Sequence, residues 1–141
     1  MSFEPARPRY TLSFAGKDYE LLGTMELIES VEFALKRGIT QIAVDVMDEM
    51  PTGELIRLVS AILTACDHKM GVQEGRALIW DKVGVTGDAN LLLRASLYSF
   101  LSICLAPPEK REKKAKDAGE LLGKLSKASP GPNTSDSASG S

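Results

Sequence analysis

Two side chains near the middle of the chain have the residue types from which a metal site could be built. Cys66 and His68 lie two positions apart and could ligate a metal ion through sulfur and nitrogen. The chain has only two Cys and one His, so no second cluster completes the four ligands of a zinc site. Cys66 and Cys104 each lie inside an apolar helical pattern, where a free cysteine acts as a small hydrophobic residue. We therefore expect structural roles for both cysteines and a place at the surface or at a helix end for His68.

The densest acidic cluster consists of Asp45, Asp48 and Glu49. Carboxylates bind divalent cations, but such sites use a loop turned by glycine, which this segment lacks. We interpret the cluster as the solvated face of a helix. The sequence also has no nucleophile elbow, phosphate-binding loop, paired CxxC or HExxH motif, and a single His excludes most histidine-based acid–base sites. These observations predict a protein that is not an enzyme and uses no metal or cofactor.

The one basic cluster lies between residues 110 and 116. Acidic residues interleave with it, and it contains no aromatic residue on which a base could stack. The net charge of the chain is −2, which also argues against a protein built mainly to bind nucleic acid. We expect this cluster to steer a protein partner instead. The candidates for electrostatic steering are Lys110, Arg111, Lys113 and Lys114.

The first elements along the chain that would position these residues have the periodicity of strands. Tyr10, Leu12 and Phe14 alternate with polar residues, and a turn-rich break at 15–18 precedes a second extended segment that ends at Leu22. This spacing predicts a β-hairpin over residues 9–22.

Helical periodicity begins after Gly23. Thr24 is a suitable N-cap for the first helix, and Gly38 is expected to stop it. Residues 39–50 fit either a strand or a helix; we favour a helix because it would place the acidic cluster on one polar side. Pro51-Thr52 is expected to cap a nearly all-apolar helix over about 53–67.

Two further helices complete the predicted domain. Residues 73–83 indicate a short helix in which Trp80 packs its ring on the core. A loop at 84–88 follows, and Thr86 or Asp88 is expected to cap an apolar helix that ends at Leu105.

The fold class predicted from these elements is α+β and mainly helical, with a hairpin followed by four or five helices. The longest apolar stretch, residues 91–106, contains Arg94 and three serines and is too short to span a bilayer comfortably. We therefore expect a cytoplasmic protein without a membrane segment. The predicted divisions are an irregular N-terminus (1–8), a globular domain (9–106), a charged helical extension (107–128) and a disordered tail (129–141).

The helices at 53–67 and 91–105 carry more apolar surface than a small domain can easily bury. Apolar surface left over after folding usually marks a protein–protein site, although both helices could equally form the core pair. The candidates for core or partner contact are Leu55, Leu58, Ile62, Trp80, Leu97 and Phe100, and in the extension Leu121, Leu122 and Leu125.

The order of these elements carries a family resemblance. It rests on the hairpin at residues 10–19 (YTLSFAGKDY), the helix opening at 25–32 (MELIESVE), the helix opening at 52–58 (TGELIRL) and the final apolar helix. Over residues 9–106 the chain resembles the tail assembly chaperones, or tail-tube-associated proteins, of gene transfer agents and siphophage-like prophages.

The resemblance implies a function in assembly. Such chaperones bind the long helical tape-measure protein, keep its apolar surface from aggregating, help to recruit tail-tube proteins, and are absent from the mature particle. The alternatives are a structural tail component, such as a tube-associated or completion protein, and a cytoplasmic regulatory adaptor. Self-association as a homo-oligomer stays open.

Overall fold

A two-stranded hairpin opens the fold, as predicted. The computed structural model describes residues 4–128, and the tail predicted to be disordered lies outside them. Strands β1 (Arg9–Phe14) and β2 (Lys17–Leu22) pair antiparallel, with Phe14 opposite Lys17. Ala15 and Gly16 connect them with φ values of 55° and 83°, because the tight turns that suit a hairpin need positive φ.

The hairpin alternates between a buried and an exposed face. Leu12 and Phe14 on β1 and Tyr19 and Leu21 on β2 are buried. The exposed face carries side-chain hydrogen bonds across the strands, including one from Ser13 Oγ to Asp18 Oδ1 at 2.6 Å. This alternation fixes which face of the hairpin lies on the helices.

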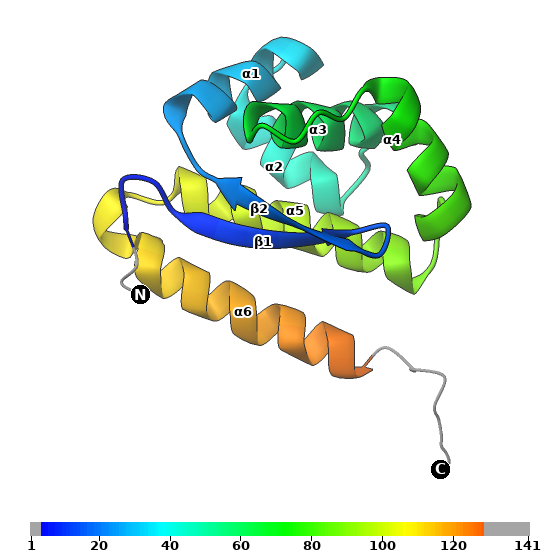
Figure 1. Ribbon diagram of the computed structural model, residues 1–141. Coiled ribbons are helices and arrows are strands. Elements are labelled where there is room, and N and C mark those ends of the chain that lie inside the picture. The colour runs from blue at the N-terminus through cyan, green and yellow to red at the C-terminus, as the bar shows by residue number, and fades with distance from the viewer. Residues whose placement is uncertain (1–3, 129–141) are drawn as a thin grey trace.

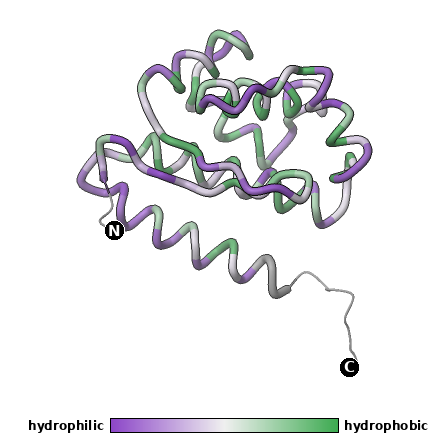
Figure 2. The backbone as a smooth tube through the Cα atoms, viewed as in Figure 1, coloured by the Kyte–Doolittle hydropathy of each residue, from purple (hydrophilic) through white to green (hydrophobic). Residues whose placement is uncertain are grey.

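Six α-helices follow within residues 4–128, so the fold is α+β and mainly helical, as predicted (Figure 1). Helix α5 packs against β1, α2 and α6, while α3 packs against α1 and α4. Figure 2 shows hydrophobic segments on α3 and α5 and a largely hydrophilic α6. The helices are α1 (Met25–Leu35), α2 (Ile39–Met47), α3 (Thr52–Ala65), α4 (Val72–Leu78), α5 (Asp88–Leu105) and α6 (Arg111–Ala128), with a π-helical turn η1 (Ile79–Val83) after α4 and a 3₁₀ turn η2 (Pro108–Lys110) before α6.

Helix α1 begins as predicted and ends earlier than predicted. The Thr24 hydroxyl accepts a hydrogen bond from the Leu27 N–H at 3.1 Å, which confirms the N-cap. The expected stop at Gly38 is wrong. Lys36 takes the left-handed conformation (φ 59°) that ends the helix, and Gly38 instead precedes α2 with a φ of −71°.

The expected cap of α3 is right in part, and the expected cap of α5 is wrong. Pro51 is the N-cap of α3, as predicted, whereas Thr52 is the first helical residue. Gly87, with a φ of 97°, is the N-cap of α5, since a glycine reaches that conformation without a steric penalty. Asp88 lies inside the first turn, where a negative charge is favourable.

The predicted helix in residues 39–50 is confirmed as α2, which ends at Met47, and side chains of other helices bind both of its ends. The carboxylate of Glu32 on α1 accepts a hydrogen bond from the Ile39 N–H at 2.9 Å. Arg94 Nη1 on α5 donates to the carbonyls of Val46 at 3.2 Å and Met50 at 3.0 Å. A negative group at the N-terminus and a positive group at the C-terminus both complement the helix dipole.

Arg94 also joins α5 to the loop before it. Its Nε donates to Asn90 Oδ1 at 2.8 Å, and Asn90 Nδ2 donates to the Gly84 carbonyl at 2.9 Å. Burial lowers the pKa of Arg94, but its guanidinium donates three hydrogen bonds that hold the group in place. One side chain therefore connects α2, α5 and the loop after η1.

The extension after Pro108 is helical, as predicted, and folds back along α5 as α6 (Figure 1). Arg111 donates to the carbonyls of Ala106, Cys104 and Pro5 at 3.0, 3.1 and 2.6 Å. These three bonds hold the start of α6 to the end of α5 and to the N-terminal segment. None of the helices in residues 4–128 is both long and apolar enough to cross a bilayer.

Replacing Arg94 by Met should lower the free energy of unfolding by about 2–4 kcal/mol, since three partly buried oxygens lose their donor. Urea unfolding measures this change, and amide exchange should show that α2 loses protection first. Arg57 is the matched control, because it is exposed on α3 and the described residues give it no hydrogen-bond or ion-pair partner. Arg57→Met should stay within about 0.5 kcal/mol of the parent. Equal stability of the two variants would contradict this role of Arg94.

Candidate protein-binding surface

The structure divides the predicted contact residues between core and surface. Five of them are completely buried and belong to the core, so they present no surface to a partner. They lie on α3 and α5, whose near-apolar circumference is covered by the hairpin and the neighbouring helices. The residues are Leu55, Leu58, Ile62, Leu97 and Phe100.

Trp80 is placed differently from the prediction. Its side chain is 73% exposed, and the neighbouring Ile79 is buried in its place. Successive residues on a helix point about 100° apart, so burial of Ile79 turns Trp80 outward. The expectation that its ring packs on the core is therefore wrong, and Trp80 is available to a partner.

The predicted residues of the extension also fall into different environments. Leu121 is exposed and Leu122 is half-buried, while the side chain of Leu125 lies outside the described part of the chain. Lys113 pairs with Asp117 at 3.1 Å on the surface. Lys110 and Lys114 are exposed. Arg111 does not steer a partner as a free surface charge, because its guanidinium is bound to three backbone carbonyls.

A groove of about 290 Å³ lies where the start of α1 meets the end of α5. We call it the α1–α5 groove. The Met25 side chain at its edge is 68% exposed, and Leu105 is also exposed. It is lined by Ala6, Pro8, Gly23, Thr24, Met25, Ile28, Ile39, Cys104, Leu105 and Arg111.

The floor of the α1–α5 groove depends on Gly23. The Gly23 N–H donates to the Pro8 carbonyl at 2.8 Å and holds the N-terminal segment beside β2. A Cβ atom at this position would lie 2.7 Å from Cys104 Sγ and 3.0 Å from Pro8 Cγ. Only glycine therefore lets these two segments approach so closely, which leaves the apolar wall of the groove continuous.

A second apolar region follows α5 between α2 and α6. Leu91 and Tyr98 lie three residues before and four residues after Arg94, so all three share one face of α5. Arg94 reaches the carbonyl of Val46, next to the exposed Met47, and Tyr98 lines a small cavity together with Leu121 of α6. We call this region, defined by Met47, Leu91, Tyr98 and Leu121, the α2–α5–α6 face.

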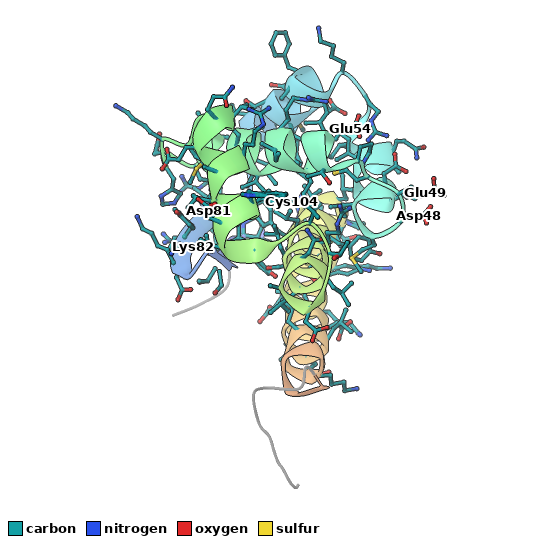
Figure 3. The ribbon with its side chains drawn as sticks, turned by 90° about the vertical axis from the view of Figure 1, so that its right-hand side faces the viewer. Asp48, Glu49, Glu54, Asp81, Lys82 and Cys104 are labelled. Atoms are coloured by element: carbon teal, nitrogen blue, oxygen red, sulfur yellow. The ribbon has the colours of Figure 1, made fainter. Side chains whose placement is uncertain are left out.

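The acidic cluster does not converge on a shared point. Asp45 forms an ion pair with Arg37, which also binds Glu54 at 2.6 Å, and the hydrogen bond from Arg37 lowers the pKa of Asp45. Asp48 and Glu49 point outward from the end of α2 (Figure 3). Among residues 4–128, no three His, Cys, Asp or Glu side chains are grouped so as to hold a metal ion.

The two cysteines lie around the junction of β2 and α1. Cys66 Sγ accepts a hydrogen bond from the Leu22 N–H at 3.4 Å, and Cys104 lies against Gly23. Burial raises the pKa of Cys104 to about 12 and also raises the pKa of Cys66. Both thiols therefore stay protonated at neutral pH and are poor nucleophiles. His68 lies at the end of α3, where Nε2 is 2.8 Å from the Glu20 carbonyl and the ring contacts Tyr19 edge-on.

The sequence-based candidates omitted two of the three most exposed apolar residues. Phe33 is 85% exposed, and Met25 opens the α1–α5 groove. A signal for Phe33 was present, because it lies off the stripe of Leu27, Val31 and Leu35 that α1 buries. No comparable signal existed for Met25, because the α1–α5 groove forms only where the end of α5 packs beside the start of α1.

Comparisons with family models, with curated proteins and with solved structures found no match for this chain.

Native protein at pH 8 should react with a thiol reagent far more slowly than denatured protein, in which both thiols become available. Because the folded pKa of Cys104 lies above its ordinary value of 9.0, the native state keeps a proton that the unfolded state loses. The free energy of unfolding should therefore fall as the pH rises from about 9 towards 12. Burial raises the pKa of Tyr10 and adds to this fall.

Cys104→Ala provides the control for this pH dependence. The variant should be less stable at neutral pH because of the cavity, but its stability should fall less steeply above pH 9. Rapid, stoichiometric labelling of both thiols in the native protein would contradict the burial described here.

Proposed function

We propose that this chain is a non-enzymatic assembly chaperone for a tail of the phage or gene-transfer-agent type. In this role it binds the helical tape-measure protein, keeps the apolar surface of that protein from aggregating and aids assembly of the tail tube. It acts in the cytoplasm of the bacterial host and is absent from the finished particle. We take the tape-measure protein as the partner because residues 9–106 resemble this family.

The observation that carries the proposal is the α1–α5 groove. Its walls are mostly apolar, with Thr24 and Arg111 as polar lining residues, and the apolar side chains of Met25 and Leu105 in it are exposed. Apolar side chains of an amphipathic helix, spaced three or four residues apart, fit such a groove. The exposed Phe33 and Trp80 add apolar surface that the fold does not use.

The direct experiment is co-expression with the tape-measure protein encoded in the same genome. The chain should raise the soluble yield of that protein and co-purify with it. Mass spectrometry of purified particles should not detect the chain, whereas a structural tail component would be present in them. No gain in solubility and no complex would contradict the proposed function.

Met25→Glu tests the groove itself. The substitution puts a charge on the apolar edge, and it should not reduce stability because a negative group is favourable in the first turn of a helix. Binding to the tape-measure protein should weaken by about tenfold or more, the loss expected for a buried contact residue. Isothermal titration or co-purification against a concentration series measures the change.

Gln73→Glu is the matched control for Met25→Glu. It adds the same charge on the exposed side of α4, where Gln73 Oε1 already accepts a hydrogen bond from Arg76. Its binding should equal that of the parent chain. If both variants bind like the parent, the α1–α5 groove is not the docking site.

A further inference from the structure

Within the described residues, the side-chain hydrogen bonds that hold helix α6 to the rest of the molecule lie at its start. Arg111 makes three hydrogen bonds to backbone carbonyls there. Beyond this residue, Ala118 is the one buried side chain among those that the structure describes in α6. The other α6 residues placed beside α5 are half-buried or exposed, such as Leu121 and Leu122.

The surface beneath α6 is not filled by it. A cavity of about 150 Å³, open to solvent, lies on one side, between Tyr98, Ser99 and Ser102 of α5 and Ala118 and Leu121 of α6. A second open cavity of about 200 Å³ is lined by Leu122, by Leu92 and Ser96 of α5 and by the β1 residues Thr11 and Ser13. The side chains that line these spaces are not covered by α6, so α6 covers this surface incompletely.

The sequence of α6 makes it a weak helix. Gly119 and Gly123 lie in its interior, and glycine is the poorest helix-forming residue after proline. A Cβ atom at either position would meet no other atom within 4 Å, so packing does not require glycine there. The helix therefore opens more easily than the same segment with alanine would.

The surface beneath α6 has the properties of a helix-binding site. It already holds one helix, α6, antiparallel to α5 and beside the hairpin (Figure 1). The cavities on both sides leave room for larger apolar side chains than Ala118 and Leu122. The surface also continues into the α2–α5–α6 face, where Leu91 and Tyr98 are exposed next to α6.

We propose that α6 is a displaceable cover, and that the surface of α5 and β1 beneath it binds an amphipathic helix of a protein partner with larger apolar side chains. The partner helix replaces α6, fills the two cavities and contacts Leu91 and Tyr98. This inference rests on the proposed function for the identity of the partner and adds a second docking surface to the α1–α5 groove.

The test uses the full chain and a fluorescently labelled peptide as the probe. The peptide has the sequence of residues 111–128 with Ala118→Leu, Gly119→Ala and Gly123→Ala, so that it is a better helix and fills the first cavity. It should bind the full chain, as measured by fluorescence anisotropy. Because the peptide must displace the tethered α6, any change that stabilises α6 must weaken binding of the peptide.

Two variants of the full chain change α6 in opposite directions. Gly119→Ala with Gly123→Ala stabilises the helix and should weaken peptide binding by about 25-fold, at roughly fivefold for each glycine. Arg111→Gln removes the three backbone contacts and should strengthen binding. Gly53→Ala is the matched control, since it adds a methyl group to α3 without touching α6 and should leave binding unchanged.

Hydrogen exchange of the unbound chain gives an independent measurement. The amides of α6 should exchange well before those of α5, and the double glycine replacement should slow them. Exchange of α6 only together with global unfolding would overturn the proposal. Peptide affinity that is the same in the parent, the double variant and Arg111→Gln would also overturn it.

The outcomes separate this inference from the proposed function. If the tape-measure protein does not bind but the peptide displaces α6, the docking surface stands and its partner is another protein. If the tape-measure protein binds but the peptide and exchange measurements fail, the inference alone is wrong.

Discussion

The need to cover helix α5 on several sides decides where the hairpin, α2 and α6 lie. This helix of 18 residues is apolar around most of its circumference, so the hairpin, α2 and α6 each pack against a different part of it. Arg94 is the one charged residue of α5 beyond its first turn, and it binds the Val46 carbonyl in the last turn of α2 and the Met50 carbonyl just after this helix. The N-cap residue of α2 provides no side-chain hydrogen bond. Arg94 at one end and Glu32 at the other therefore hold this short helix at one defined position.

Local patterns in the sequence were sufficient for the hairpin and the helices. Alternation of Leu12 and Phe14 with polar residues, and the Thr24 cap, depend on neighbours a few positions away, so both could be predicted. The role of Arg94 could not, because its partners lie more than 40 residues away along the chain. Arg111 was predicted to be a steering charge for the same reason, since its partner Pro5 comes from the other end of the chain.

The candidate surface was only partly predictable. The leftover apolar surface predicted on the helices at 53–67 and 91–105 is found only on the second, where Leu91, Tyr98 and Leu105 are exposed. The more exposed Phe33 and Trp80 lie on other helices, and most of the residues chosen for contact are in the core. An all-apolar helix such as α3 gives no indication of which side stays uncovered until its neighbours are placed. The groove beside Met25 likewise needs five segments of the chain to meet, and it depends on the close approach of Cys104 to Gly23.

On the proposed function, the exposed apolar side chains are not required by the fold and serve a partner instead. Its most direct test replaces the three most exposed of them, Met25, Phe33 and Trp80, by serine in one chain. Urea unfolding followed by circular dichroism then measures the free energy of unfolding of this triple variant. We expect a free energy of unfolding within about 1 kcal/mol of that of the parent, because exposed positions contribute little packing energy. A loss of more than about 3 kcal/mol, the size expected for buried side chains, would contradict it.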